Sequence, residues 1–401
     1  MIASRHTLDD ARVVHKEAHS LRAAGHEVLL LFACNLRSEY VRHDGRVLAA
    51  GTGSDCEGEH LGFRVFGKPK RKGLLGKLRS YRELASLAAR LEADVYHAHE
   101  PDLALAVALG ARRRLARRGR RASVVHDMHE YPPGEVVDGL PRVVKGPAHA
   151  AAVLRDRALN RRVDQVFTAN TVVRGYAQIL SRATPVDVLF NGPALRLFPQ
   201  PEPTAWAGPG EPLVLCHEGS LGFNRGLREM VAAVDRLRDR VRLVVIGDVF
   251  GAEREWLDRE IAARDLGGVV TRTGWLPYEA VGEAVRHSHA GLILFRDCLI
   301  NTLAGPPNKL FNYMNAGLPV LSIGFPEMRR IITEEQCGIL IADQSVEAIV
   351  RGIEGLLRSP DRLRAMGEAG QRAIRDRYSW ECMERRLVSS YDELGRRLER
   401  E

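Results

Sequence analysis

Short apolar segments rich in β-branched residues alternate with helical patterns along almost the whole chain. In the first half these segments occupy residues 26–33, 93–99, 122–129, 164–170 and 186–191. In the second half they occupy residues 212–219, 241–248, 268–274, 290–295, 318–324 and 338–342. Apolar segments of this length, separated by helices, are typical of parallel sheets covered by helices on both faces. The pattern therefore predicts an α/β fold with two doubly wound, Rossmann-like domains.

A proline-rich segment separates the two halves. Residues 191–212 contain six prolines and show no apolar period, which predicts a hinge between an N-terminal domain, 1–190, and a C-terminal domain, 213–378. The last segment, 379–401, is an amphipathic helix with no strand after it, and we expect it to pack back on the N-terminal domain. The opening residues 1–4 are short for a first strand, which suggests that a few residues precede them.

Composition places the chain among ordinary globular proteins. It has 401 residues, too many for one compact core, with 45% hydrophobic and 27% charged residues. No apolar run approaches the roughly 20 residues of a membrane span, and no signal peptide opens the chain, so we expect a cytoplasmic protein. The six cysteines are scattered without a C-x-x-C pair, which argues against a zinc site or a disulfide framework.

The net charge of +8 is concentrated in the first half of the chain. Residues 1–190 carry 31 Lys and Arg against 21 Asp and Glu, whereas residues 191–401 carry 28 against 30. Two basic stretches, 67–82 and 110–121, either form a face for anionic lipid or another acidic partner, or are a solvated surface. They lack interleaved aromatic residues, and no finger or helix-turn-helix spacing occurs, so we expect no nucleic-acid binding.

Two strand-to-helix junctions in the second half have the features of phosphate-binding sites. "HEGSLGFNRGL" (217–227) is a glycine-rich turn that ends with Arg225 before a helix. "PPNKLFNYMNAGLPVL" (306–321) places Lys309 and Asn312 on one face of a short helix near its N-terminus. A helix N-terminus with a nearby cation favours phosphate. Each signal alone also fits a tight turn or an exposed lysine, but together they predict a site for a nucleoside diphosphate.

The first half gathers histidines and acidic residues at two strand ends, "YHAHEPD" (96–102) and "VVHDMHEYPP" (124–133). The carboxyl ends of parallel strands meet at one edge of the sheet, so these side chains should converge on a cleft between the domains. Strand alternation sends His97 and His99 to one face, and some of the histidines are expected to be buried, structural residues. No tight metal-ligand spacing occurs, so we expect no metal.

Taken together, these stretches resemble the retaining glycosyltransferases of the GT-B fold, specifically glycosyltransferase family 4. The resemblance covers nearly the whole chain. It includes "DDARVVHKEAHSLRAAGHEV", the two histidine-bearing strand ends, "VLFNGPALRLF" and the donor loop "GSLGFNRGL". The most specific match is "PNKLFNYMNAGLPV", which is similar to the P-N-K-L-F-E-Y-M element of one subgroup.

The resemblance implies a role for each matching residue. Arg225 and Lys309 would hold the diphosphate of a nucleotide-sugar donor, and His129 would contact the reacting sugar; these three are the catalytic candidates. The donor-binding candidates are Gly219, Ser220, Arg225, Gly305, Asn308, Lys309, Asn312 and Trp275, the last in a segment that would hold the base. Candidates on the acceptor side are His6, His99, Glu100 and Glu130. Family members need neither a metal nor another cofactor.

Three departures from the family pattern fall in the donor site. Asn312 stands where the family usually has a Glu that binds the ribose hydroxyls, Ala304 replaces a second Glu, and Ser220 replaces an Arg. We expect the amide of Asn312 still to bond a ribose hydroxyl. Substituting Asn312→Glu is then expected to tighten nucleotide binding by about 1 kcal/mol, because hydrogen bonds to charged groups are the stronger ones.

These observations favour an enzyme that transfers a sugar from a nucleoside diphosphate to an acceptor hydroxyl with retention of configuration. The departures leave two alternatives: a degenerate scaffold protein that accompanies a catalytic partner, or a nucleotide-sugar epimerase of the same fold. The acceptor could be a glycan, a lipid-linked molecule or a small molecule. The basic first domain would suit peripheral contact with an anionic membrane.

Overall fold

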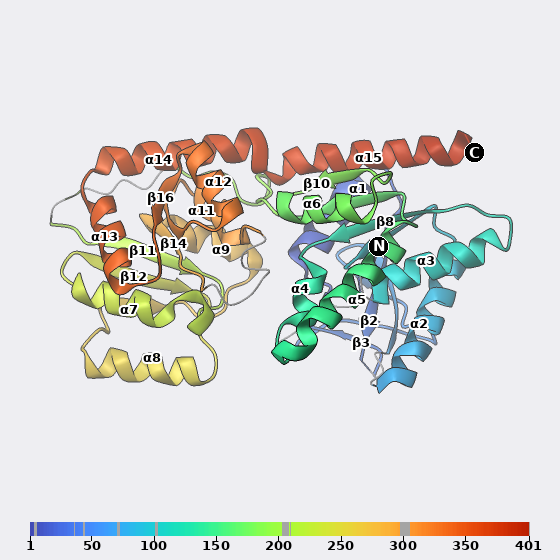
Figure 1. The fold of residues 1–401 in the computed structure, drawn as a ribbon, viewed down its shortest axis with the longest axis horizontal. Helices are drawn as coiled ribbons and strands as arrows, with labels where there is room; N and C mark the ends of the chain where they lie inside the picture. The colour runs from blue at the N-terminus through green and yellow to red at the C-terminus, as the bar shows by residue number, and fades with distance from the viewer. Residues whose placement is uncertain are drawn as a thin grey trace. The chain divides into compact units, whose positions relative to one another are not determined.

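The computed structural model describes residues 1–3, 6–35, 37–42, 45–69, 73–100, 103–202, 208, 210–296 and 305–400. The chain forms two compact units (Figure 1). Unit 1 comprises Met1–Phe190 and Met383–Glu401, and unit 2 comprises Asn191–Cys382. The expected hinge, 191–212, is therefore counted with unit 2, and its residues 203–207 and 209 lie outside the described part.

The sheet of unit 1 has eight strands in the order β10-β9-β8-β7-β1-β2-β6-β5, and only β5 runs antiparallel to its neighbour. The strands are β1 Ile2–Ala3, β2 Leu29–Cys34, β5 Gly58–His60, β6 Phe63–Pro69, β7 Val95–His99, β8 Ser123–Met128, β9 Gln165–Thr168 and β10 Val186–Val188. A separate hairpin pairs β3, Glu39–Val41, with β4, Val47–Ala50. The five strands predicted here are confirmed, whereas β5, β6 and the hairpin were not predicted.

Helices cover both faces of this sheet. They are η1 Ala11–Ala18, which has π-helical hydrogen bonds, α1 His19–Ala23, α2 Gly73–Arg90, α3 Leu103–Ala116, α4 Pro132–Val137, α5 Arg142–Asn160, α6 Thr171–Leu180 and α15 Trp380–Arg400. α2, α3 and α6 share one apolar core with the strands, and η1 builds a second core on the opposite face. The C-terminal helix α15 contacts unit 1, because Tyr391 bonds His97 and Met383 accepts a hydrogen bond from the Phe190 amide.

Unit 2 has a six-stranded, wholly parallel sheet in the order β13-β12-β11-β14-β15-β16. Its strands are β11 Leu213–Glu218, β12 Val241–Ile246, β13 Val270–Arg272, β14 Ala290–Ile293, β15 Val320–Ile323 and β16 Gly338–Ile341. Its helices are η2 Phe223–Arg225, α7 Leu227–Arg236, α8 Ala252–Ala263, α9 Tyr278–Arg286, α11 Asn308–Asn315, α12 Pro326–Glu335, α13 Val346–Leu357, α14 Pro360–Ala373 and η3 Ile374–Tyr378. All six predicted strands are present.

The short helix α11 packs closely on the sheet of unit 2. Pro307 precedes its first turn, and Gly317, with a φ of 72°, ends it before β15. A Cβ at Gly291 of β14 would lie 2.1 Å from Cδ2 of Tyr313, so only glycine lets the α11 tyrosine approach the strand. The Tyr313 hydroxyl then accepts a hydrogen bond from the backbone N–H of Glu218 at 2.7 Å. This contact fixes α11 against the end of β11.

Among the described residues, none of the helices combines the length and the apolar character needed to cross a membrane.

Candidate functional site

The candidate phosphate site lies at the carboxyl end of the unit 2 sheet. Strand β11 is central, with β12 on one side and β14 on the other, so the strand order reverses between β11 and β14. Doubly wound sheets bind ligands outside such a switch point, where neighbouring loops diverge. The loop after β11 leads to Arg225 in η2, Phe295 follows β14, and α11 supplies Lys309. The two sequence motifs are thus brought to the same end of the sheet.

Because Gly219 has no side chain, the space next to Lys309 and Arg225 stays open. Its φ is 86°, and a Cβ at this position would lie 3.8 Å from Lys309 Nζ and 3.9 Å from an Arg225 guanidinium nitrogen. Both cations also lie near the ring of Phe295, with Lys309 Nζ 5.5 Å and Arg225 Cζ 5.7 Å from its centroid. Two positive groups around a residue without a side chain form a site that suits an anion.

Lys309 is held in an environment that disfavours its own charge. The side chain is only 5% exposed, and Nζ donates to His217 Nε2 at 2.9 Å. Burial, together with the nearby Arg225 guanidinium, lowers the pKa of Lys309 to about 7. Burial likewise holds the pKa of His217 well below its usual value, so this imidazole is neutral and its Nε2 can accept the hydrogen bond from Lys309. An anionic ligand would relieve the repulsion between the two cations.

Asn312 is paired with a carboxylate that the sequence analysis did not identify. Its Nδ2 donates to Glu218 Oε1 at 2.8 Å, and Glu218 is the last residue of β11. The other carboxylate oxygen, Oε2, is buried and has no hydrogen-bond partner among the described residues. Burial raises the pKa of Glu218, whereas Lys309 and Asn312 act in the opposite direction. Asn312 stands where the family usually has Glu, and the carboxylate of Glu218 lies directly beside its side-chain amide.

The remaining donor candidates lie on the loops around this site. Asn308 is the first residue of α11 and accepts a hydrogen bond from the Asn191 amide at 3.0 Å. Ser220 is exposed and Gly305 is partly exposed. Trp275 follows β13 and is 54% exposed, so its indole can still contact a ligand. Ala304 lies outside the described residues.

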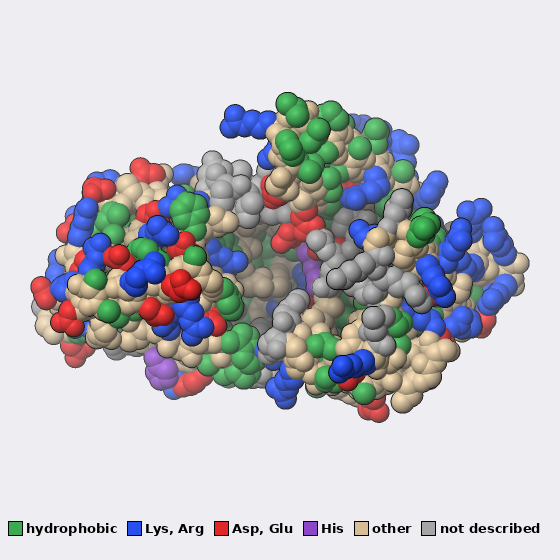
Figure 2. Space-filling view, turned by 90° about the horizontal axis from the view of Figure 1, so that it is seen from below, with side chains coloured by type: hydrophobic (Ala, Val, Ile, Leu, Met, Phe, Trp, Pro, Cys, Tyr) green, Lys and Arg blue, Asp and Glu red, His purple; other side chains and the backbone are tan. Residues whose placement is uncertain are grey.

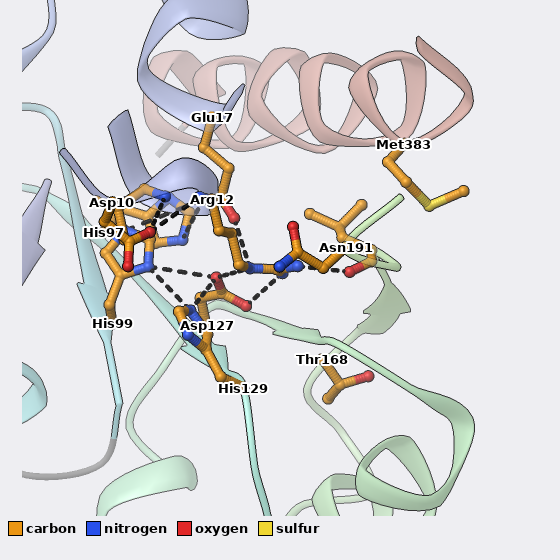
Figure 3. A network of polar contacts seen from close by, with 12 residues as sticks. Asp10, Arg12, Glu17, His97, His99, Asp127, His129, Thr168, Asn191 and Met383 are labelled. Atoms are coloured by element: carbon orange, nitrogen blue, oxygen red, sulfur yellow. Dashed lines mark hydrogen bonds and ion pairs between the residues drawn. The ribbon is translucent and has the colours of Figure 1, made fainter. Parts of the chain in front are cut away.

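Unit 1 contains a buried network centred on Asp127, at the end of β8 (Figure 3). Arg12 of η1 donates to both Asp127 oxygens, each at 2.8 Å, and to the Leu189 carbonyl at 2.6 Å. The same guanidinium lies 3.0 Å from Glu17 Oε1. Burial alone would raise the pKa of Asp127, but Arg12 and His129 hold it well below its usual value. The η1 helix is therefore tied to β8 by a bidentate ion pair.

His129 lies next to this network at the edge of the sheet. Its Nε2 donates to Asp127 Oδ2 at 2.8 Å, and its Nδ1 lies 3.5 Å from Glu100 Oε1. The side chain keeps 14% of its surface exposed. Glu100 has a φ of 69°, an uncommon left-handed conformation for a residue with a side chain. The ring of His129 is therefore oriented by two carboxylates and still reaches solvent.

The acceptor-side candidates differ in their exposure. His6 packs on His129 with ring centroids 4.9 Å apart, and its Nδ1 bonds Asp10 Oδ2 at 2.8 Å. Glu100 is largely buried and Glu130 is exposed. His99 is fully buried, so its side chain cannot contact an acceptor, and that prediction is wrong. The H-x-H spacing does place His97 and His99 on one face, but this face is directed into the core.

Arg12, Glu17, His217 and Glu218 were missed as candidates. Arg12 and Glu17 lie in η1, which continues directly into α1, and buried apolar positions of the two helices include Val13, Ala18 and Leu21. Glu17 is four residues from Val13 and from Leu21, so it falls on the apolar face of the helix. A charged residue on a buried face is the signal that could have identified it. His217 and Glu218 directly precede the glycine turn, at the end of a strand, where functional side chains are expected.

Two groups of described residues have the composition and proximity of metal ligands. One is fully buried and contains Glu17, His97, His99 and Asp127. The other is partly exposed and contains His6, Glu100 and His129. Both belong to unit 1.

Two family models match the chain over most of its length. A glycosyl transferase 4-like domain matches residues 11–192, and the model of glycosyl transferases group 1 matches residues 202–373. The chain belongs to the group 1 glycosyltransferases, family 4. This is a family of nucleotide-sugar-dependent, retaining enzymes with the GT-B architecture, and its two matched models correspond to the two parallel-sheet units of this glycosyltransferase.

Known proteins similar to this glycosyltransferase include one curated relative and many solved structures. An uncharacterized glycosyltransferase of Methanocaldococcus jannaschii is 25% identical over 191 residues, which are 46% of this chain and 45% of that protein. Sucrose-phosphate synthase from Thermosynechococcus elongatus has a TM-score of 0.70 at 15% identity and covers 98% of both chains. Anabaena HepE, solved in complex with UDP and glucose, has a TM-score of 0.61 at 16% identity, covering 82% of this chain and 86% of its own.

Proposed function

We propose that this glycosyltransferase moves a hexose from a nucleoside diphosphate-sugar to an acceptor hydroxyl, with retention and without a metal ion at the leaving group. The observation that carries the proposal is the pair of cations, Arg225 and Lys309, which both lie within 4 Å of the position that a Cβ on Gly219 would take. As the bond to the sugar breaks, negative charge develops on the departing diphosphate. Two fixed cations stabilise that charge without reorganisation of solvent.

A donor panel tests the proposal. The full-length protein is incubated with UDP-, GDP- and dTDP-sugars in a buffer containing chelator, and release of the nucleoside diphosphate is measured together with the anomeric configuration of the product. We expect turnover with one base, and UDP is the first to test because the similar HepE was solved with UDP and glucose. An epimerised donor would indicate the epimerase alternative, and no turnover with any donor would indicate the scaffold.

We also assign the enzyme to the subgroup with the P-N-K-L-F-E-Y-M element. Pro307, Asn308, Lys309 and the following Leu310 and Phe311 match that element residue by residue. Leu310 and Phe311 belong to α11 and are buried, so the apolar part of the element packs the helix onto unit 2 while Lys309 faces the site. The departure at Asn312 is accompanied by Glu218, whose carboxylate lies against the amide.

Asn312 and Glu218 together are proposed to bind the ribose hydroxyls of the donor. Glu218 supplies the carboxylate that Asn312 lacks, and one of its oxygens has no hydrogen-bond partner among the described residues. A ribose diol offers two donors, which a carboxylate and an amide oxygen can accept. Glu218→Gln should therefore weaken nucleotide binding, and unchanged calorimetric affinity for UDP would contradict this role.

His129 is proposed to contact the reacting sugar. Its orientation by Asp127 and Glu100 and its residual exposure support a role in turnover. His129→Ala should then lower kcat more than it raises the donor KM, because the lost contact is made at the sugar and not at the nucleotide. Normal kcat with a raised KM would show that His129 acts only in binding or in structure.

For the acceptor side we propose contact with an anionic membrane, which suits a lipid-linked acceptor. On α2, Leu75 is 82% and Leu78 50% exposed, next to the exposed Lys77 and Arg79. Lys and Arg side chains also crowd the right-hand end of the molecule in Figure 2, the end that carries α3 in Figure 1. Co-sedimentation with vesicles containing phosphatidylglycerol should fall in Leu75→Glu and in high salt. A variant that sediments like the wild type would favour a solvated surface and a soluble acceptor.

A further inference from the structure

Three polar atoms converge in the interior of unit 1 without a hydrogen-bond partner among the described residues. They are His97 Nε2, His99 Nε2 and Glu17 Oε2. The three residues are 1%, 0% and 0% exposed. Glu17 Oε2 lies 3.5 Å from His97 Nε2 and 4.0 Å from His99 Nε2, and the two imidazoles stack with centroids 4.6 Å apart. Buried polar atoms are almost always satisfied, so three together indicate a bound species.

The opposite ring nitrogens of both histidines are already oriented. His97 Nδ1 bonds the Tyr391 hydroxyl at 2.8 Å, and His99 Nδ1 lies 3.3 Å from Asp127 Oδ2. With protons on Nδ1, each Nε2 carries a lone pair, and the nearest carboxylate oxygen to both is Glu17 Oε2. Histidines that bind metals in proteins use this arrangement, in which the second N–H is donated to a carboxylate or another acceptor that fixes the ring.

The charges around the three atoms also favour a cation. Glu17 and Asp127 share a single guanidinium, that of Arg12, which leaves one of the two carboxylates without a full positive partner. Burial of Glu17 beside Asp127 raises its pKa well above the usual value. Burial also holds the pKa values of His97 and His99 below their usual range, so both imidazoles are neutral and able to act as ligands.

We propose that Glu17, His97 and His99 bind one divalent transition-metal ion of the zinc type through Oε2 and the two Nε2 atoms. Ligand atoms bound at about 2.0–2.1 Å in a tetrahedral site lie about 3.3–3.5 Å from one another. Glu17 Oε2 already lies 3.5 Å and 4.0 Å from the two Nε2 atoms, whereas the rings of His97 and His99, only 15° from parallel, must rotate toward each other to bind one ion. Two imidazoles and one carboxylate suit zinc, whereas magnesium and calcium prefer oxygen ligands. The ligands come from η1 and β7, far apart in the sequence, which is why motif spacing did not reveal them.

The proposed ion would have a positioning role and not a role in sugar transfer. It would join η1 to β7 and strengthen the bond from His99 to Asp127, the same carboxylate that orients His129. A cavity of about 560 Å³ adjoins one of the proposed ligands: His97 and Tyr391 line it together with Ile2 of β1, Leu29 of β2 and Leu398 of α15. The inference does not depend on the identity of the donor or acceptor.

Metal analysis of the full-length protein tests the proposal. The protein is purified without an affinity tag, dialysed against chelator and titrated with Zn²⁺ and with Co²⁺. We expect about one equivalent bound per chain, a Co²⁺ absorption spectrum typical of four-coordinate N/O ligation, and a rise in Tm on loading. Glu17→Gln keeps the shape of the side chain but removes the anionic ligand. It should weaken the affinity by more than the roughly 10–100-fold typical of a second-shell change.

Two further variants separate binding from folding. Tyr391→Phe removes only the hydroxyl that orients His97 and should weaken the affinity by about 10-fold, within the second-shell range. His126→Ala is the matched control, because His126 is equally buried on the adjacent strand β8 but bonds Asn160 at 2.7 Å. It should bind metal like the wild type. A folded wild-type protein that binds neither ion, or equal affinities in the wild type and Glu17→Gln, would overturn the proposal.

Discussion

The candidate donor site of unit 2 and the histidine network of unit 1 solve opposite electrostatic problems. Around Gly219, two cations lie together with little compensation, and burial lowers the pKa of Lys309 to about 7. Around Asp127, by contrast, two buried carboxylates, those of Asp127 and Glu17, share the guanidinium of Arg12, which is bonded to both oxygens of Asp127. Two cations without full compensation favour an anionic ligand, whereas a buried bidentate ion pair ties two elements of the fold together. The comparison predicts that substitution of Arg12 affects stability and that substitutions of Lys309 and Arg225 affect donor binding.

The largest effect is expected from Arg12→Ala in unit 1. It leaves Asp127 and Glu17 buried without their guanidinium, and breaking a buried ion pair in this way costs about 3–5 kcal/mol of unfolding free energy. Urea and thermal unfolding followed by circular dichroism measure the loss. The control is Arg112→Ala, whose pair with Asp164 is partly exposed and should contribute about 0.2–1 kcal/mol. Equal losses in the two variants would remove the distinction between a buried network and a surface pair.

Lys309→Ala and Arg225→Ala should be the most damaging changes for turnover. Each removes a cation from the departing diphosphate, and loss of one transition-state donor costs about 10²–10³-fold in rate, or about 2.7–4 kcal/mol. Stability should change little, because both residues form part of a site with excess charge. Donor titrations at saturating acceptor give kcat and KM. Arg228→Ala serves as the control, since this exposed residue of α7 pairs with Glu253 at 3.1 Å and should behave like the wild type.

The pH dependence of donor binding should follow the charge on Lys309. Its pKa in the free protein is lowered to about 7, so the lysine is mostly charged below pH 7 and mostly neutral above it. A diphosphate binds the charged form, and affinity should therefore fall by up to about tenfold per pH unit above pH 7, with proton uptake on binding. Calorimetry with a UDP-sugar between pH 6 and 9 measures this. Lys309→Arg remains charged and should give a flatter profile; a flat wild-type profile would contradict the lowered pKa.

The two regions also differ in how much of them the sequence predicts. The unit 2 site is built from two short continuous segments, so Gly219, Arg225 and Lys309 could be identified as phosphate-site candidates from local pattern and their proximity from the sheet topology. The unit 1 network joins η1, β7, β8 and α15, and its pairings depend on packing that no local pattern encodes. The strand β6 was missed because Gly67 and Lys68 interrupt its apolar run. The carboxylate of Glu218 was missed because its contact with Asn312 joins residues far apart in the chain.

The smallest expected effect is that of Asn312→Glu on nucleotide binding, and its sign is the opposite of the one predicted from the sequence. From the sequence alone, Asn312→Glu was expected to tighten nucleotide binding by about 1 kcal/mol. Glu218 Oε1 lies 2.8 Å from the Asn312 amide, so a glutamate there would place two carboxylates in contact near a diphosphate. We now expect the substitution to weaken UDP binding by about 1 kcal/mol, because like charges in a half-buried site repel and one must be protonated.

The charge-exchanged double variant sharpens this last prediction. Glu218→Gln combined with Asn312→Glu moves the carboxylate to α11, where relatives have it, and keeps one amide beside it. Calorimetry on the wild type, both single variants and the double variant forms a complete cycle. If the pair acts as a unit, the double variant should bind UDP about as tightly as the wild type, while each single variant binds more weakly. Additive losses would mean that Glu218 and Asn312 act independently, and that the carboxylate of β11 does not replace the missing glutamate of α11.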